Sequence, residues 1–373
     1  MENENLYLRL ATVARYQDKY ILTAFKINAI FIYDLKSRKV TYIGSFQAEQ
    51  ESYCMYIRSF LYKDEIWFIP EDAKKISILN MHNMQIGYIS IHADKEKSMK
   101  GSKYNNFVKF NNKYVCLVPG CMREAVIINM ETKKIENYYN ISNQNEEFQS
   151  AVFIDNTLRF YPWNGNRKVI LNLSSKELNY EEWDGNEKYG DAIYDKISGN
   201  IFHAPAKEDH VLIEDIQGEL VEKVSIFSSN NEECHTFYSS CYNGEILFWA
   251  VQGVQGERGV ISFKVREHDI RYYQINVKEM LIPIDSPDKE AFTFGGNKIF
   301  YYDEIQKEYI DINIEITFGE FLNQLKKAGK NFYDIYKYME HEYEIENDPL
   351  TLNTFIYLAQ SNSSTNNKQD FIQ

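Results

Sequence analysis

Three of the seven histidines lie in one stretch of the sequence and supply the residue type best suited to acid–base chemistry. They are His203, His210 and His235, and an acid, Asp191, precedes them. Histidine suits proton transfer because its proton equilibrium lies near neutral pH. The stretch predicts a catalytic site in which His235 and His210 exchange protons and Asp191 orients them. The alternative is that all three are ordinary hydrogen-bonded histidines.

The sequence offers no recognisable metal or phosphate motif. Neither His-Glu-x-x-His nor Cys-x-x-Cys occurs, and Cys116 and Cys121 form too poor a pair for a structural zinc site. The glycine-rich segment 251–259 matches neither phosphate-loop pattern. We therefore predict no metal and no cofactor.

A second set of residues suits the binding of an anion. Basic side chains recur at Arg58, Arg123, Arg167, Lys168 and Arg258. Arginine presents a planar pair of donors, so this set predicts a site for a carboxylate, phosphate or sulfate group. The alternative is a solvated rim whose basic side chains keep the loops soluble.

Other residues suit contact with a ligand's less charged parts. Trp163 and Asn164 stand together, and an exposed tryptophan beside an amide suits stacking on a sugar ring or a peptide side chain. Trp163 is equally suited to packing against a neighbouring loop. His203 is placed with these ligand-binding residues.

Composition limits the class of partner. The chain has 41 lysines and arginines against 54 aspartates and glutamates, a formal net charge of −13. Such a balance argues against general binding to nucleic acid or to an anionic membrane. No apolar run is long enough to span a bilayer, and the acidic start lacks a secretory signal. With five scattered cysteines, an odd number, we expect reduced thiols and a cytoplasmic protein.

All these residues belong to a sequence repeat, whose fold determines where they lie. A short turn followed by an apolar run recurs seven times at spacings of 46, 48, 44, 43, 45 and 53. Each copy contains four short runs rich in β-branched and aromatic residues, joined by turns such as Asn111-Asn112 and Asp155-Asn156 that favour positive φ. The anchor positions of the copies are Tyr20, Ile66, Tyr114, Leu158, Ile201, Ile246 and Ile299.

Repeated four-stranded units of this length are typical of a β-propeller. Over residues 5–316 the chain resembles β-propeller repeat proteins of the kelch and WD40 kind in architecture. It carries no subfamily motif, since only the last copy has the paired glycine of kelch repeats and the Gly-His and Trp-Asp marks of WD40 repeats are missing. The resemblance implies an all-β, seven-bladed propeller and no particular activity.

The ends of the repeat suggest how the ring closes. In the seventh copy, runs at 292–294, 299–302 and 309–316 predict three strands, and the orphan run 6–8 is expected to supply the fourth. A six-bladed ring is the alternative. We divide the chain into a propeller (1–316), C-terminal helices (317–360) that buttress or plug the propeller or dock a partner, and a disordered tail (361–373).

In a propeller, the loops that join strands b to c and d to a meet at one face, the top face, around the central channel. Most of the singled-out residues fall at that face. We expect a binding scaffold that recognises a charged peptide, a protein segment or a small anionic ligand there. The alternative is a hydrolase, lyase or isomerase acting on a sugar or modified peptide at the fifth and sixth copies. No nucleic acid or membrane partner is expected, and the oligomeric state is open.

Overall fold

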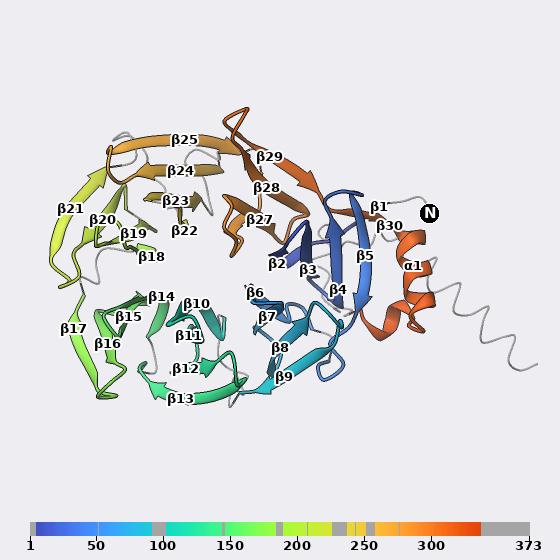
Figure 1. Cartoon of the computed structure of the whole chain (residues 1–373), viewed down its shortest axis with the longest axis horizontal. Coiled ribbons are helices and arrows are strands. Elements are labelled where there is room, and N and C mark those ends of the chain that lie inside the picture. The colour runs from blue at the N-terminus through green and yellow to red at the C-terminus, as the bar shows by residue number, and fades with distance from the viewer. Residues whose placement is uncertain are drawn as a thin grey trace, which may run out of the picture.

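Seven four-stranded antiparallel sheets surround a central channel (Figure 1). The computed structural model describes residues 5–50, 52–91, 102–143, 146–183, 189–206, 208–225, 237–242, 244–250, 258–275 and 277–336. The protein is thus the all-β, seven-bladed propeller that the repeat predicts, and its seven complete sheets exclude a six-bladed ring.

Each blade runs from an inner strand at the channel to an outer strand at the rim. The first four blades contain β2 (Leu10–Tyr16), β3 (Lys19–Ala24), β4 (Ile27–Asp34) and β5 (Lys39–Gly44); β6 (Tyr56–Tyr62), β7 (Glu65–Pro70), β8 (Lys75–Asn80) and β9 (Ile86–Ser90); β10 (Tyr104–Phe110), β11 (Tyr114–Pro119), β12 (Glu124–Asn129) and β13 (Lys134–Asn140); β14 (Glu147–Ile154), β15 (Thr157–Asn164), β16 (Arg167–Asn172) and β17 (Leu178–Glu182).

The last three blades follow the same order. They contain β18 (Tyr189–Asp195), β19 (Asn200–Pro205), β20 (His210–Glu214) and β21 (Leu220–Ser225); β22 (Phe237–Tyr242), β23 (Glu245–Ala250), β24 (Arg258–Lys264) and β25 (Asp269–Ile275); β26 (Met280–Pro283), β27 (Glu290–Phe294), β28 (Lys298–Asp303) and β29 (Glu308–Asn313). The tight inner turns form as predicted, because Asn111, Asn112, Asp155 and Asn156 all adopt positive φ.

The strands predicted for the seventh blade are each assigned one position too early: the predicted first strand is in fact the second strand of the blade. The first six anchors lie in the second strand of their blades, but Ile299 lies in β28, the third. The second strand, β27, instead contains Ala291, and 291 − 246 = 45 restores the period. The inner strand β26 was missed because it is short and is followed by the loop 284–289 rather than a tight turn.

The N-terminal strand therefore does not complete blade 7. Strand β1 (Asn5–Tyr7) pairs with β30 (Glu315–Thr317) in a separate two-stranded sheet, with Leu6 opposite Ile316. The chain next reaches blade 7 itself, where Leu10 exchanges backbone hydrogen bonds with the turn at Gly295 and Gly296. The two ends of the propeller are thus tied together, although by a different pairing from the expected one.

The helix α1 (Phe318–Lys327) lies at the outer rim, against the edge of blade 1 (Figure 1). Its apolar face packs on that blade, with the rings of Phe321 and Phe31 5.5 Å apart. The Gln324 side chain accepts from the Tyr42 N–H (2.6 Å) and donates to the Val40 carbonyl (3.3 Å), so it occupies polar groups that an edge strand otherwise exposes. This helix buttresses the propeller and does not enter the channel.

A single-turn 3₁₀ helix (Phe332–Asp334) follows α1. The second helix expected near 348–358 and the tail 361–373 lie outside the described residues. Within the described part, no helix has the length and apolar character needed to cross a membrane.

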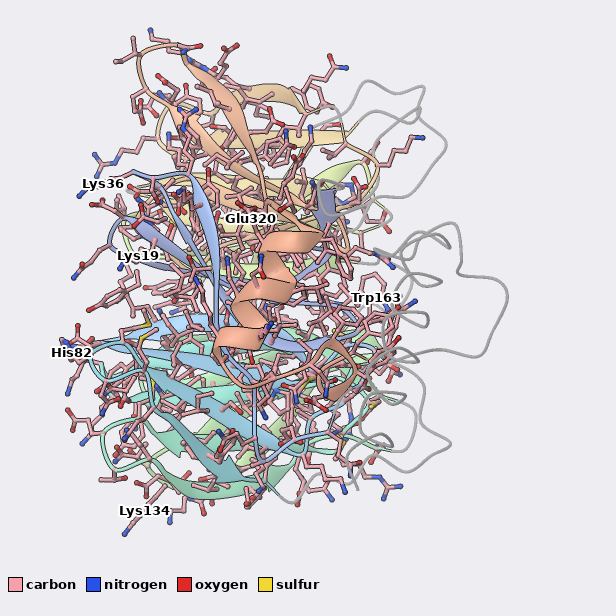
Figure 2. All side chains as sticks on the ribbon, turned by 90° about the vertical axis from the view of Figure 1, so that its right-hand side faces the viewer. Lys19, Lys36, His82, Lys134, Trp163 and Glu320 are labelled. Carbon is pink, nitrogen blue, oxygen red and sulfur yellow. The ribbon has the colours of Figure 1, made fainter. Side chains whose placement is uncertain are left out.

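The two faces of the disc carry different connections. Lys19, Lys36, His82 and Lys134 belong to the turns between first and second or third and fourth strands, and Trp163 ends a second strand. Figure 2 shows Trp163 on the opposite side of the disc from those four residues. We keep the name top face for the side of Trp163 and call the other side the bottom face.

Candidate functional site

The top ends of the inner strands share an irregularity that directs side chains into the channel. In blades 1 to 5 the pairing of the first two strands slips by a bulge near the start of the inner strand, between Leu10 and Thr12, Tyr56 and Arg58, Tyr104 and Asn106, Phe148 and Ser150, and Tyr189 and Ala192. A bulge inserts an extra residue and re-aims its neighbours. The polar residues after these bulges differ from blade to blade, which gives the channel a chemically varied rim.

The channel encloses a cavity of about 870 Å³, to which all seven inner strands contribute. This volume lies in the range of small-molecule binding sites, roughly 300–1,000 Å³. Its polar lining includes Arg58, Ser59, Asn106, Asp191 and Tyr238, which we call the channel site.

Arg58 is the cation of the channel site and is nearly fully buried, with 7% of its surface exposed. Its guanidinium carbon lies 4.2 Å from the centre of the Tyr238 ring, a stacking contact between blades 2 and 6 across the channel. Its Nη1 and the neighbouring Ser59 hydroxyl have no hydrogen-bond partner among the described residues. Two buried donors therefore remain unused beside a cavity, which is costly unless a ligand or water meets them.

Asp191 is the acid of the channel site and is also buried. Its carboxylate accepts hydrogen bonds from the Asn106 side chain (3.0 Å) and from the backbone N–H groups of Ala192 (3.0 Å) and Ser239 (3.2 Å). Burial raises the pKa of Asp191 to about 6, against the lowering effects of the Ser239 N–H and the Arg58 charge. The ion pairs of the described residues do not include one between Arg58 and Asp191.

The floor of the channel is crossed by the loop between β26 and β27. Asp285 in this loop forms a parallel backbone bridge with Phe60 of blade 2 and an ion pair with Lys109 of blade 3, at 2.6 Å from Nζ to Oδ2. The loop therefore joins blade 7 to the opposite side of the ring near the bottom face. The channel site lies at the other end, near the top face.

Of the predicted histidines, the described residues His203 and His210 do not line the channel cavity. His203 lies between blades 4 and 5, where its Nε2 is 3.1 Å from the Glu214 carboxylate. The Tyr161 hydroxyl donates to the same carboxylate (3.2 Å), and the Lys168 ammonium lies 3.8 Å from it. Together with Trp183, whose ring contacts those of Tyr161 and His203, these residues form the blade 4–5 cluster.

The electrostatics of the blade 4–5 cluster are internally balanced. Burial raises the pKa of Glu214, but the hydrogen bond from His203 and the Lys168 charge outweigh it and leave this pKa lowered. Lys168 also pairs with Glu181 at 3.1 Å. His203 and Lys168 thus act within the protein fold, as buried partners of an acid.

His210 lies near this cluster rather than near Asp191. Its Nε2 is 2.7 Å from the Tyr189 hydroxyl and its Nδ1 is 2.9 Å from Asp209. It does not line the channel cavity, whereas Asp191 does. His235 lies outside the described residues. Within the described part, no three histidine, cysteine or acidic side chains are grouped to hold a metal ion.

The predicted basic residues divide in the same way. Arg58 enters the channel site, but Arg167 forms a two-pronged ion pair with Glu146 (2.6 and 2.5 Å) and stacks on Tyr180. Arg123 is exposed. Trp163 is half-buried at the top face, and the side chains of Asn164 and Arg258 lie outside the description.

Three residues of the channel site, Asn106, Tyr238 and Ser59, were not predicted from the sequence. A repeated signal marks part of the site, because an aromatic residue followed two positions later by a polar one recurs at the blade period, as Tyr56 and Arg58, Tyr104 and Asn106, Phe148 and Ser150, and Tyr189 and Asp191. An alignment of the copies on their inner strands would have shown that these polar residues occupy equivalent positions in their blades.

Comparison with known proteins supports the fold and no activity. No protein-family model matches the sequence, and no curated protein does. Among solved structures, virginiamycin B lyase from Staphylococcus aureus superposes with a TM-score of 0.57 at 14% identity, over 83% of this chain and 97% of that one. A streptogramin B lyase gives 0.53 at 15% identity, over 80% and 93%.

A third solved structure, Hsv2 from Kluyveromyces lactis, gives a TM-score of 0.50 at 9% identity, over 83% of this chain and 99% of that one. At such identities the similarity shows the propeller fold alone, and propellers serve many functions. The class of this protein is therefore a seven-bladed β-propeller, and its function must be argued from its own residues.

Proposed function

We propose that this protein is a binding protein that takes the carboxylate, or another oxyanion, of a small ligand into the channel site. The observation that carries the proposal is the Arg58 guanidinium, which is buried beside a cavity of about 870 Å³ and whose Nη1 has no partner among the described residues. The Ser59 hydroxyl, which also has no partner in the described part of the chain, supplies a second donor. Arginine and hydroxyl donors are the usual partners of a bound oxyanion.

Other residues of the channel site suit a ligand with both polar and flat apolar parts. Tyr238 presents a ring beside the guanidinium, and the Asp191 carboxylate can accept a hydrogen bond from a ligand donor. Propeller loops and inner strands from several blades meet here, which is where binding residues commonly concentrate. The alternative of an enzyme has less support, because His210 and Asp191 do not share a cavity.

The expected location of the protein belongs to this proposal. The cysteines of the described part form no disulfide with one another. Reduced thiols are compatible with a cytoplasmic binding protein.

A selection experiment tests the proposed function. The protein is incubated with a defined mixture of small organic acids and tetrapeptides with free carboxyl termini, and retained compounds are identified by mass spectrometry. The wild type and Arg123→Gln, which alters an exposed arginine, should retain the same acids. Arg58→Gln should weaken their binding by about tenfold or more, a loss of at least about 1.4 kcal/mol of binding free energy. Equal retention by Arg58→Gln, or no retention by the wild type, would overturn the proposal.

A further inference from the structure

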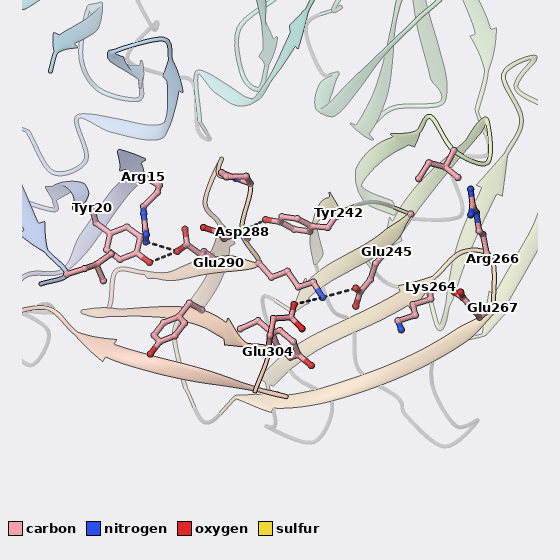
Figure 3. A pocket seen from close by; sticks show the side chains of 17 residues that line it. Arg15, Tyr20, Tyr242, Glu245, Lys264, Arg266, Glu267, Asp288, Glu290 and Glu304 are labelled. Atoms are coloured by element: carbon pink, nitrogen blue, oxygen red, sulfur yellow. Dashed lines mark hydrogen bonds and ion pairs between the residues drawn. The ribbon is translucent and has the colours of Figure 1, made fainter. Parts of the chain in front are cut away.

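A second cavity opens on the bottom face, between blades 6 and 7 and the start of blade 1. It has a volume of about 690 Å³ and is bordered by the bottom-face turns of these blades (Figure 3). Gly244 and Arg266 belong to turns of blade 6, and Asp288 and Glu304 to turns of blade 7. We call it the bottom-face cavity.

Glu290, at the start of β27, is the buried acid of this cavity. Its side chain is 3% exposed. One carboxylate oxygen, Oε1, accepts from the Tyr20 hydroxyl at 2.6 Å and from Arg15 Nη1 at 2.9 Å, which joins blade 7 to blade 1. The other oxygen, Oε2, has no hydrogen-bond partner among the described residues. Burial of an unpartnered carboxylate oxygen is costly.

A second acid lies beside Glu290. Burial raises the pKa of Glu290, and the negative charge of Asp288 raises it further, against the lowering effects of Tyr20 and Arg15. The Ser286 hydroxyl also lowers this pKa, but it donates its hydrogen bond to the Asp288 carbonyl at 3.0 Å. The ring of Tyr242 lines the same part of the cavity, and its hydroxyl donates to the Asp288 carbonyl.

The cations nearest to these acids are already engaged. Arg15 is bound to Glu290 Oε1, and the Lys289 ammonium lies 2.8 Å from Glu245 and 3.8 Å from Glu304. Figure 3 shows Lys264 and Arg266 at the far end of the cavity from Glu290. The Glu290 end therefore combines a buried oxygen that has no partner among the described residues, a second carboxylate and an aromatic face, which together suit a positively charged group.

We propose that the bottom-face cavity binds an alkylammonium group, with Glu290 Oε2 accepting its hydrogen bond and Asp288 and Tyr242 beside it. Two sources supply this chemistry, a free polyamine and the lysine side chain of a peptide. This site lies at the bottom-face turns, whereas Arg58 and Asp191 lie near the top ends of their strands, although Tyr242 borders both cavities. The proposal does not depend on the function proposed for the channel site.

Titration calorimetry with two probes tests the proposal. The probes are spermidine and acetyl-Gly-Lys-Gly-amide, and the one that binds more tightly identifies the source. The wild type should bind at least one of them, and Glu290→Gln should weaken that binding by about tenfold or more. Thermal unfolding of Glu290→Gln without a probe checks that the variant folds. Asp288→Asn, which leaves the contacts of Glu290 with Tyr20 and Arg15 in place, should also weaken binding.

The matched control is Glu304→Gln, because Glu304 borders the same cavity but its side chain is 77% exposed. Binding driven only by the net negative charge would fall equally in Glu304→Gln and Glu290→Gln, and that result would overturn the proposal. Absence of binding by the wild type to both probes would also overturn it. Arg58→Gln should bind these probes as the wild type does, which separates this site from the channel site.

Discussion

Two regions of the propeller bury charged side chains, and they do so in opposite ways. In the blade 4–5 cluster, Glu214 is met by His203, Tyr161 and Lys168, and Lys168 is met by a second acid. In the channel site, Nη1 of Arg58 has no hydrogen-bond partner among the described residues and lies beside a large cavity, and no described ion pair joins Arg58 to the acid of the same site.

The difference separates a structural use of buried charge from a functional one. A buried charge whose ion-pair and hydrogen-bond partners all belong to the protein helps to hold two blades together. Removal of one partner leaves the others buried and uncompensated. A buried charge without a protein partner beside a cavity lowers stability, and such local destabilisation is typical of ligand-binding sites. On this basis we assign His203 to the structure and propose a binding role for Arg58.

The largest expected effect is a loss of stability on mutation of the blade 4–5 cluster. Glu214→Gln removes the charge that meets His203 and Lys168, so the free energy of unfolding should fall by about 3–5 kcal/mol. Chemical denaturation at neutral pH measures this loss. The matched control is Glu181→Gln, which touches the same Lys168 from a half-exposed position and should cost about 1 kcal/mol or less. Equal losses in the two variants would remove the distinction between the regions.

A smaller effect is expected from pH at the channel site. Because the pKa of Asp191 is raised to about 6, its carboxyl is neutral below that pH and charged above it. A bound oxyanion is repelled only by the charged form, so its affinity should rise several-fold as the pH falls from about 7.5 to about 5.5. The affinity of a retained acid, measured across this range, should vary much less in Asp191→Asn. An affinity of the wild type that is flat across pH 6 would contradict the placement of the anion near Asp191.

The same raised pKa has a consequence for stability, with the opposite sign from an ion-paired acid. In the unfolded chain Asp191 ionises near its usual pKa of 3.8, below its folded value of about 6. Its contribution therefore favours the folded state most at low pH and declines as the pH rises from about 4 to about 6. Ionised Asp191 persists at neutral pH because hydrogen bonds and the rest of the fold hold it in place.

The smallest effect is expected at Arg167, which sequence analysis grouped with Arg58. Its ion pair with Glu146 is partly exposed, with 23% and 12% of the two side chains accessible. Arg167→Gln should therefore lower the free energy of unfolding by only about 1 kcal/mol or less and leave the affinity for acids unchanged. A loss of affinity comparable to that of Arg58→Gln would show that the anion site extends to the rim.

The sequence predicts the blades well, but it predicts few of the contacts between distant parts of the chain. Apolar periodicity and turn residues predicted the blades, because each blade is a local unit of four hairpin-linked strands. The seventh blade was misplaced by one strand because its inner hairpin has a long loop instead of a tight turn. The pairing of β1 with β30 brings the two ends of the propeller together, and no local sequence pattern reveals such a contact.

Two residues of the channel site, Arg58 and Asp191, were singled out from the sequence, but not as members of one group. Arg58 and Asp191 were singled out in different sets, and only closure of the ring brings blades 2 and 5 to the same cavity. Conversely, His203 and Lys168 come from adjacent blades and were also assigned to different regions of the face. Histidine and lysine side chains look the same in a sequence whether their partner is a ligand or a buried glutamate.

The proposed binding function is tested most sharply by asking whether the Arg58 guanidinium itself contacts the anion. Side-chain N–H resonances of arginine in the ¹⁵N-labelled protein can be observed by NMR, and that of Arg58 is identified by its loss in Arg58→Gln. On addition of an acid retained in the selection, we predict that the Arg58 resonance shifts with saturation while that of the exposed Arg123 does not. A saturating shift at other arginines, with the Arg58 resonance unmoved, would show that the anion binds elsewhere and would overturn the proposed function.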